Sequence, residues 1–577
     1  MKRKVTSALL TAGLAATVFA APIFSGNFEA GAKNADQEVA AAPAPKFFSG
    51  VEMESDTVKR LQSAGSEVKE PKPQHLEKLE AKSKFDKSEP KPLALGEIQA
   101  MQNTFVVLVK FPTKEDGSSS VPGAPTTRVP AKYFQDLIFG TEYNPYDLKE
   151  GDLDFTGMAE HNGVKAPTDS TLYNYYKEVS YGKVEVSTYD NIVWVTAPHP
   201  YEYYLKEANG FGNYPQNVQG LVQDALKEVD NQVDFSRYAI DGEVPGVFVV
   251  HEGTGAEFSG DPGQIWSHKW QLSWKYDEAA GDYVYDPFVL DGVVIDTYSM
   301  EPEVGGDLTG FSGFKYGPLP PYVGVYAHEF AHVLGLPDLY DYGYESAGVG
   351  AWSVMAGGSW TRYPNHYNYS GNKPVHLDAW NKYFAGLVDV KQVENNSSVN
   401  FNLGNSVDSN VIYKINVPRS NGTEYFLVEN RQQVGFDQGL GRYGADLHGL
   451  AVWHVDDNIL YKNFSRPNEA ENWNPDRNGE RLGYKVRTGG VDPATHHYGV
   501  SLVQADGKFN LEKNKPADAG DVFRSGSLEL SNTFYSGSFY TWPGSNGEGF
   551  FNIKNIKEEN GVLSGTINTN ATGSYKK

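Results

Sequence analysis

The residues best suited to chemistry lie in the sequence AHEFAHVLGLPD, just past the middle of the chain. His328 and His332 are four residues apart, so on a helix they share one face and can bind the same metal ion. Glu329 can reach a water molecule at that metal without being a ligand itself. Gly335 lets the chain leave the helix sharply, and Asp338 can then supply a carboxylate oxygen. Three protein ligands with one open position are typical of a catalytic zinc site.

The third ligand has an alternative, because some zinc sites take a glutamate from a second helix downstream. The nearby candidate is Glu345, which lies in the sequence DYGYESAG. That sequence is too rich in glycine to favour a helix, so Asp338 is the better candidate. The HExxH pattern can also occur by chance on an ordinary amphipathic helix. Glycine and aspartate at the required offsets favour metal-dependent hydrolysis over chance.

A lone methionine, Met355, lies in the tight turn WSVMAGGSW that follows the motif. Beneath a zinc site, such a turn supplies an apolar floor under the histidines. An isolated methionine often does no more than fill a gap in the core. The position of Met355 soon after Asp338 makes the floor a reasonable prediction.

The segments around the motif have the patterns of elements that would position it. Continuous or alternating apolar residues predict strands, and apolar residues at helical spacing predict helices. Strands are expected at 104–111, 184–187, 192–195 and 247–250, and helices at 172–179, 218–229 and 375–387. The glycine-rich segment 305–324 is expected to shape a cleft wall. Together these elements predict an α+β protease architecture, a twisted sheet backed by helices and followed by the zinc helix.

Composition limits the classes of function. A chain of 577 residues is long enough for about two to four domains. The 50 Lys and Arg against 73 Asp and Glu give a net charge of −23, which makes nucleic acid an unsuitable partner. Cysteine is absent, so histidine and carboxylate side chains must hold any metal.

The N-terminus has the pattern of an export signal, predicted to span residues 1–32. A basic stretch at 2–4 precedes a mostly apolar stretch at 8–20 that is too short to span a membrane. Residues 30–32 offer an A-x-A cleavage site, and 18–20 offer an earlier one. Later segments lack the apolar length of a membrane span, so we expect a soluble, secreted protein. Export without cysteine favours a bacterial source.

Residues 33–96 are rich in Lys, Glu, Pro, Ala and Ser, which is typical of linkers or weakly folded sequence. Such a segment can be a flexible spacer. A propeptide is the favoured interpretation, because an exported protease must stay inactive inside its producer and the protease motif follows. Without cysteine, latency must use another group to block the zinc.

The chain becomes β-rich after about residue 390, with strands expected at 410–417, 425–430, 450–455 and 549–556. Acidic residues in this region could bind calcium through their carboxylate oxygens. The candidates are Asp506, Asp518 and Asp521, and a second acidic group lies at 454–457. Aspartates of this kind also commonly cap turns, and that alternative stays open. This region could instead bind substrate or cell wall, for which the sequence gives no direct sign.

Several blocks resemble one known family, the immune inhibitor A family of secreted bacterial metallopeptidases. The similar blocks are HEFAHVLGLPDLYD, WSVMAGGSW, PVHLDAW, TLYNYYKEVSYGKVEV, IWSHKW, EYFLVENRQQVGFDQGL, LAVWHVDDN and VSLVQADGKFNLE. The resemblance implies a zinc endopeptidase with a metzincin-like catalytic domain, a propeptide and a following β-rich domain. Several metzincins carry a tyrosine two residues after the methionine of the turn. Here that position is Gly357, so the transition-state donor is not identified, and Tyr363 and Tyr367 are only candidates.

The predicted protein is therefore a secreted zinc endopeptidase made as a zymogen, acting on protein or peptide substrates and favoured to be a monomer. Its predicted domains are a signal peptide (1–32), a propeptide (33–96), a catalytic domain (97–390) and a β-rich, sandwich-like domain (391–577). The alternative is a secreted carbohydrate- or cell-surface-binding protein with a non-catalytic metal site, which could use the 36 tyrosines and 10 tryptophans. The presence of Glu329 favours catalysis.

Overall fold

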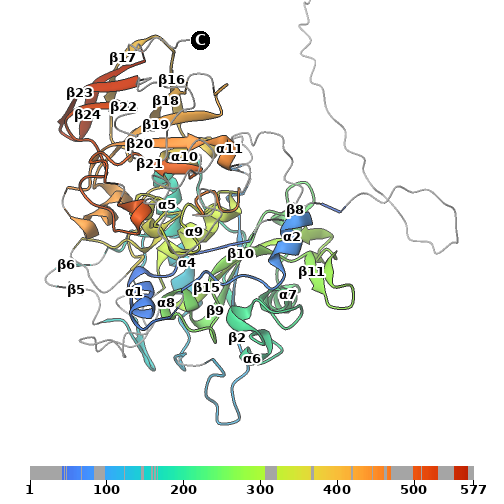
Figure 1. The fold of residues 1–577 in the computed structure, drawn as a ribbon. Helices are drawn as coiled ribbons and strands as arrows, with labels where there is room; N and C mark the ends of the chain where they lie inside the picture. Colours follow the sequence, from blue (N-terminus) through green and yellow to red (C-terminus); the bar gives the residue numbers. More distant parts are fainter. Residues whose placement is uncertain are drawn as a thin grey trace, which may run out of the picture. The chain divides into compact units, whose positions relative to one another are not determined.

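A mixed six-stranded sheet lies at the centre of the region that carries the candidate metal site (Figure 1). Its order is β1-β10-β15-β9-β2-β7, with β15, β9, β2 and β7 parallel and β1 and β10 antiparallel to their neighbours. The strands are β1 (Ser49–Gly50), β10 (His268–Gln271), β15 (Thr297–Val304), β9 (Val247–Thr254), β2 (Phe105–Lys110) and β7 (Val193–Thr196).

This computed structural model describes residues between 42 and 569, with gaps. The longer gaps are 83–97, 306–320, 470–497 and 531–550. The predicted signal peptide and most of the predicted cleft-wall segment thus lie outside the described residues. The described residues from 46 onward belong to one compact unit. Within them, no helix combines the length and apolar character needed to cross a membrane.

Strand β2 is buried on both faces, as its unbroken apolar run predicts. Val106 and Leu108 point into one apolar cluster, and Phe105, Val107 and Val109 point into another. This alternation follows from the two-residue period of a strand. Each face of the sheet therefore needs its own cover of helices.

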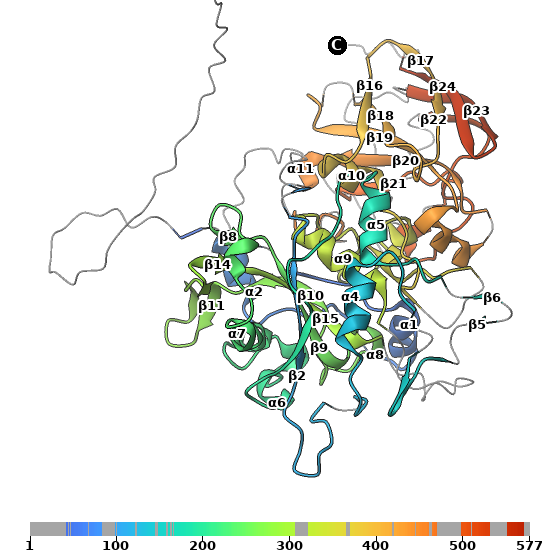
Figure 2. The ribbon, with the colours of Figure 1, turned by 180° about the vertical axis from the view of Figure 1, so that it is seen from behind.

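Helices cover the two faces separately (Figure 2). α4 (Ala131–Phe139), α5 (Leu172–Val179) and α9 (Val323–Val333) contribute apolar side chains to the cluster that contains Leu108, and α7 (Val218–Val229) contributes to the other. α7 has the bounds expected from its apolar spacing, and Asn217 caps its first turn by accepting a hydrogen bond from the Gly220 amide. The α9 helix carries the metal motif and is buried along its whole length.

Smaller elements complete this region. They are β3 (Lys149–Glu150), β4 (Leu153–Asp154), β5 (Glu160–His161), β6 (Val164–Lys165), β8 (Glu243–Val244), β11 (Trp274–Asp277), β12 (Asp282–Tyr285), β13 (Val289–Leu290), β14 (Val293–Ile295), α6 (Tyr201–Tyr204) and α8 (Ala256–Ser259). Near the N-terminus, α1 (Ser55–Ser63) and α2 (Leu76–Lys82) follow β1.

Two of the expected elements differ from the sequence-based prediction. The strand expected at 184–187 is reduced to one bridge between Ser187 and Asn103. The helix expected at 375–387 is shortened to α10 (Ala379–Phe384), because Asp378 accepts hydrogen bonds from the amides of Trp380 and Asn381 and starts the helix there. Apolar spacing located this helix, and the cap decided where it begins.

The C-terminal part contains a five-stranded and a four-stranded sheet. The first has the order β16 (Asp389–Val393), β18 (Val411–Asn416), β19 (Glu424–Arg431), β20 (Gly449–Asp456) and β21 (Val500–Leu502), with α11 (Asp457–Leu460) after β20. The second has the order β17 (Ser398–Leu403), β24 (Val562–Asn568), β23 (Phe551–Glu559) and β22 (Gly526–Leu530). On β20, Val452 packs between the two sheets, whereas Trp453 packs into the cluster that contains α9. The core of the metal-binding region thus continues across residue 390.

A buried ionic network also crosses this boundary. Arg431 on β19 is fully buried and donates hydrogen bonds to both carboxylate oxygens of Asp437. The same guanidinium donates to the carbonyl oxygen of Trp352, 2.8 Å away, at the start of the turn that holds Met355. A buried guanidinium without partners would be an uncompensated charge, so these hydrogen bonds are costly to break. Through the bond to Trp352 they connect the turn to the five-stranded sheet.

Candidate metal centre

Helix α9 presents both histidines of the motif from one buried face. The helix ends at Val333, Leu334 is its C-cap, and Gly335 follows with φ of 86°, as expected for a glycine that ends a helix. Its amide donates to the carbonyl of His332, and the Leu336 amide donates to Ala331, which closes the last turn. The chain then runs back beneath the helix and brings Asp338 to the histidines.

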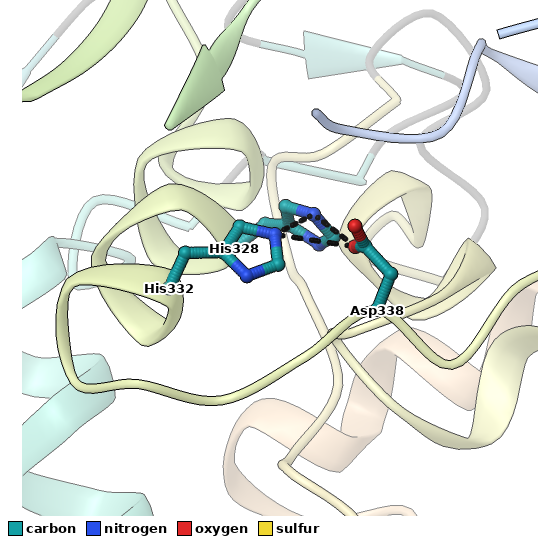
Figure 3. Close-up of side chains that lie close together, drawn as sticks. All are labelled: His328, His332 and Asp338. Carbon is teal, nitrogen blue, oxygen red and sulfur yellow. Dashed lines mark hydrogen bonds and ion pairs between the residues drawn. The ribbon is translucent and has the colours of Figure 1, made fainter. Parts of the chain in front are cut away.

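Three side chains converge at this point (Figure 3). The Nε2 atoms of His328 and His332 lie 3.0 Å apart. The Oδ1 of Asp338 lies 3.0 Å from the first Nε2 and 3.2 Å from the second. These three are the one group among the described residues whose ligand atoms could hold a metal ion, with all of them within 4.8 Å of one another.

The hydrogen bonds of the two imidazoles make the group suitable for a cation. The Nδ1 of His328 lies 2.8 Å from the carbonyl oxygen of Val354, and the Nδ1 of His332 lies 2.7 Å from that of Leu336. A carbonyl oxygen only accepts, so each Nδ1 carries a proton and each neutral Nε2 offers a lone pair. Two lone pairs and a carboxylate oxygen facing one another repel unless a cation lies among them. This donor set fits zinc.

The protonation states also suit metal binding. Burial lowers the pKa of His332, which favours neutral imidazole. Burial by itself would raise the pKa of Asp338, but His332 and His328, when they carry a proton on the facing nitrogens, outweigh it and lower that pKa to about 2. A neutral imidazole and an ionised carboxylate are the forms that bind metal.

Asp338 has a second partner that the sequence did not reveal. The hydroxyl of Tyr342 donates a hydrogen bond to its Oδ2. Burial, with Asp338 next, raises the pKa of Tyr342 well above its usual range, so the hydroxyl stays protonated and can donate. The carboxylate is thereby turned with Oδ1 toward the histidines.

Glu329 is buried beside His328, and neither of its carboxylate oxygens has a hydrogen-bond partner within the described part of the chain. Burial raises its pKa well above the usual range, and the nearby carboxylates of Glu301 and Asp338 add to the effect. Glu329 lies outside the three-ligand group. The role of Glu329 stays a prediction.

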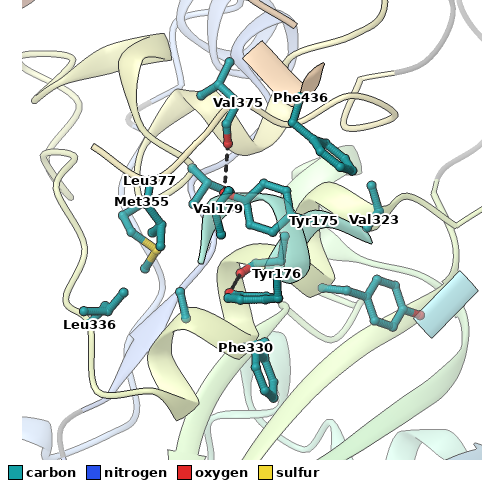
Figure 4. Close-up of a cluster of buried hydrophobic side chains, with 14 of the residues drawn as sticks. Tyr175, Tyr176, Val179, Val323, Phe330, Leu336, Met355, Val375, Leu377 and Phe436 are labelled. Atoms are coloured by element: carbon teal, nitrogen blue, oxygen red, sulfur yellow. Dashed lines mark hydrogen bonds between the residues drawn. The ribbon is translucent and has the colours of Figure 1, made fainter. Parts of the chain in front are cut away.

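The turn that holds Met355 contacts the site directly. Its Val354 carbonyl accepts the hydrogen bond from His328, and its Met355 carbonyl accepts one from the amide of Leu339 at 2.8 Å. The Met355 side chain is fully buried and belongs to the apolar cluster that also contains Leu336 and Phe330 (Figure 4). The turn thus packs against the histidine helix, and its role as the floor of a zinc site stays a prediction.

The remaining candidates stand apart from this group. Glu345, the rival third ligand, is outside it. The backbone amide of Tyr363 donates a hydrogen bond to the side chain of Asn372. Tyr367 lies outside the described residues. No donor to the transition state can be assigned to either tyrosine from these contacts.

The three predicted calcium ligands lie near one another without forming a three-ligand group within the described ranges. The Asp506 carboxylate accepts from the Lys508 amide, and Asp518 accepts from the Gly520 amide. Asp521 accepts from the indole of Trp352, while its Oδ1 is buried and has no hydrogen-bond partner among the residues that the structure describes. These contacts resemble turn caps as much as a cation site, and calcium stays a prediction.

Comparisons with known proteins agree with this geometry. The family model described as "Immune inhibitor A peptidase M6, catalytic domain" matches residues 91–388, about half of the chain. The match is to a family of metallopeptidases, and the His–His–Asp group fits the zinc cofactor that such a family implies. The chain belongs to the immune inhibitor A family, peptidase family M6, as its sequence blocks predicted.

Two curated relatives support this assignment. Immune inhibitor A of Bacillus thuringiensis subsp. alesti is 30% identical over 278 residues, which cover 44% of this chain and 34% of that protein. The pre-pro-metalloprotease PrtV of Vibrio cholerae serotype O1 is 28% identical over 282 residues, covering 44% of this chain and 26% of PrtV. The chain therefore matches about a third of the length of the Bacillus protein and about a quarter of the length of PrtV.

Proposed function

We propose that this protein is a secreted zinc endopeptidase made as a zymogen, with zinc held by His328, His332 and Asp338. The observation that carries the proposal is the convergence of two Nε2 lone pairs and one carboxylate oxygen within 3.2 Å of one another. When bound, zinc would act as a Lewis acid on the peptide carbonyl and make water a stronger nucleophile.

In this proposal Glu329 is the general base. It takes a proton from the attacking water and returns it to the leaving amine, as a carboxylate can when it lies next to the reacting atoms. Its burial and its unpartnered oxygens support the role, because no hydrogen bond among the described residues commits the carboxylate elsewhere. Tyr342 positions Asp338 through the hydrogen bond to its Oδ2.

We also infer a metzincin-like arrangement in which Met355 forms the floor of the site. The two hydrogen bonds that the turn accepts from His328 and Leu339 support this inference. The apolar cluster between the five- and four-stranded sheets supports a sandwich-like C-terminal region. The proposed boundaries stay at residues 32, 96 and 390.

The proposed propeptide, residues 33–96, includes a folded part that packs against the catalytic region. β1 pairs antiparallel with β10, and α1 and α2 follow it. An extended segment on the edge of a sheet is a common way for a peptide to occupy a binding groove. This contact supports latency, and the apolar segment near the N-terminus supports secretion.

A casein assay with and without chelator tests the proposed function. We expect the chain trimmed to begin near residue 97 to cleave casein, to lose activity when zinc is chelated, and to recover when zinc is restored. Proteolysis that persists in the metal-free protein would contradict the zinc mechanism. Zinc bound without proteolysis would instead favour a non-catalytic metal site, an alternative that the family assignment does not favour.

A further inference from the structure

The turn that holds Met355 is supported by two residues from the β-rich part of the chain. Arg431, on β19, donates from Nη1 to the carbonyl oxygen of Trp352 at 2.8 Å. Its Nε and Nη2 donate to the two carboxylate oxygens of Asp437, each at 2.6 Å. Asp437 lies in the 3₁₀ helix η7 (Gly435–Tyr443). The planar fork of the guanidinium is therefore divided between a carboxylate and the turn.

The same carboxylate reaches the turn a second time, through the backbone of His376. The Oδ1 of Asp437 accepts from the His376 amide at 3.0 Å. The His376 carbonyl in turn accepts from the amide of Val354 at 3.2 Å. Together with the bond from Arg431 to Trp352, these contacts form a closed circuit of hydrogen bonds around the start of the turn. The turn is thus held at two points by one ion pair.

This circuit is rigid because it is buried and charged. The side chains of Arg431 and Asp437 are both fully buried. Burial by itself would raise the pKa of Asp437, but Arg431 and then His376 outweigh it and hold that pKa well below its usual range. The carboxylate is therefore ionised, and hydrogen bonds between charged groups are strong where water is excluded. A small shift of the turn would weaken several of them at once.

The residue that the circuit fixes is the one that orients a metal ligand. The Val354 carbonyl accepts the hydrogen bond from the Nδ1 of His328 at 2.8 Å. Such a bond sets the tautomer of an imidazole and the direction of its other nitrogen. Any displacement of Val354 would therefore move the acceptor of His328 and turn its Nε2 away from Asp338.

We propose that Arg431 and Asp437 are positioning residues for the metal centre, holding Val354 so that its carbonyl orients His328. This role rests on the proposed function, because it needs zinc at the His–His–Asp group. The family model for the catalytic domain ends at residue 388, and both positioning residues lie beyond it. The unit that binds the metal therefore extends past the proposed boundary at residue 390.

The main test is a double variant of the full chain, Arg431→Met with Asp437→Leu. Replacing both members of a buried ion pair by apolar residues often leaves stability unchanged, whereas removing one member leaves an unpaired buried charge. The double variant should therefore fold while the turn loses its support. We expect it to bind zinc about 10-fold more weakly, measured by competition with a chelator. The effect is at the low end for groups near a metal, because Ser353 still donates to Asp378 and keeps a second support for the turn.

A spectroscopic measurement separates positioning from stability. The absorption spectrum of the Co²⁺-substituted protein depends on the arrangement of the ligands around the ion. We expect the double variant to change this spectrum while the metal-free protein melts near the wild-type temperature. Arg431→Lys should change it too, because lysine keeps the charge but lacks the fork that serves Asp437 and Trp352 together.

Arg128→Lys is the matched control. This arginine also belongs to a buried ionic group, in which it pairs with Glu303 at 2.7 Å and Glu252 at 3.0 Å. The same substitution there should leave the zinc affinity and the Co²⁺ spectrum as in the wild type. Equal effects in Arg128→Lys and Arg431→Lys would show that loss of any buried arginine weakens the centre, and would overturn the positioning role.

Failure of the positioning role and failure of the proposed function give different results. Wild-type protein that does not bind zinc stoichiometrically would overturn the proposed function. Wild-type protein that binds zinc, with a double variant and Arg431→Lys of equal affinity and unchanged Co²⁺ spectrum, would overturn the positioning role alone. If the double variant does not fold, Arg431→Lys decides by the same two measurements.

Discussion

The hydroxyl of Tyr342 donates a hydrogen bond to the Oδ2 of Asp338, whose Oδ1 lies 3.0 Å from the Nε2 of His328. The two oxygens of one carboxylate are thus divided between a tyrosine and the metal-ligand group. Such partners orient a ligand and fix its charge, and their loss usually weakens metal binding without abolishing it. The affinity of the centre for zinc should therefore depend on Tyr342, which is not itself a ligand.

Tyr342→Phe should weaken zinc binding by about 10- to 100-fold, because the ring stays while the donor to Asp338 is lost. The ring stacks on Tyr340 with centroids 4.9 Å apart, and phenylalanine can keep that contact. Tyr340→Phe is the control, since it removes a hydroxyl bonded to Gly50 rather than to a ligand. Equal zinc affinity in Tyr342→Phe and wild type would show that Asp338 is oriented by other contacts.

Asp338→Ala should weaken zinc binding far more than Tyr342→Phe does, because only two histidine ligands remain. If Asp338 instead caps the turn that follows Gly335, the same change should cost about 1 kcal/mol of stability and leave zinc in place. Asp338→His discriminates further, since imidazole can serve as a third ligand. Stoichiometric zinc in dialysed Asp338→Ala would exclude Asp338 from the ligand set.

Glu329→Gln should retain zinc while proteolysis falls by several orders of magnitude, because an amide cannot accept the proton of the attacking water. His328→Ala is the paired comparison and should lose both metal and activity. Zinc content and casein turnover are measured on the same preparations. Near wild-type turnover in Glu329→Gln would assign the general base to another residue.

Local patterns in the sequence were sufficient to predict the metal-binding helix and its surroundings. Two histidines at helical spacing with Gly335 beyond them predict the helix, its end and the return of Asp338, and the structure brings these side chains together. The strand at β2 and the helix at α7 were also predictable, because β2 buries an unbroken run of apolar residues and α7 buries apolar residues at helical spacing. These features depend on residues that are close in sequence.

The contacts that the sequence could not reveal join distant residues. The composition of residues 33–96 is typical of weakly folded sequence, yet β1 pairs with a strand more than two hundred residues away. Glu70 is buried by Tyr344 and its neighbours, and no local pattern distinguishes it from the exposed glutamates around it. Tyr342 was missed for the same reason, because its partner is set by the path of the chain after Gly335.

Latency should depend on how closely β1 packs against β10. A Cβ at Gly50 would lie 2.9 Å from the Oε1 of Glu70 and 3.1 Å from the carbonyl oxygen of Ser267, so a larger side chain displaces the strand. We expect the uncleaved chain to be weakly active, Gly50→Val to be more active, and removal of residues up to Gly96 to give full activity. Ala64→Val, at an exposed position after α1, should behave as wild type.

The measurement is casein turnover by uncleaved chains whose N-termini have been sequenced. Full activity in the uncleaved wild-type chain would show that residues 33–96 are a spacer and not an inhibitor. Equal, low activity in Gly50→Val and wild type would show that latency does not depend on the β1–β10 pair.

Acid should destabilise the central sheet through two buried histidines. His268 on β10 lies 2.6 Å from the Trp266 carbonyl through Nδ1 and 3.0 Å from the Tyr298 hydroxyl through Nε2, so its neutral ring is satisfied. Burial lowers the pKa of His268 to about 3 and that of His251 to about 4. In the unfolded chain both pKa values return to about 6.5.

Between these values each of the two histidines is protonated in the unfolded chain and neutral in the folded one, so its contribution to the free energy of unfolding falls as the pH falls below about 6.5. At pH 5 each histidine should lower the free energy of unfolding by about 2 kcal/mol relative to pH 8. This free energy should keep falling until the pH reaches the pKa of that histidine in the folded chain. Denaturant unfolding of metal-free protein from pH 8 to pH 4 measures this slope. His268→Gln removes one titrating ring and should flatten it, whereas His199→Gln, at an exposed position, should not. Parallel curves for His268→Gln and wild type would show that His268 is not a source of the acid sensitivity.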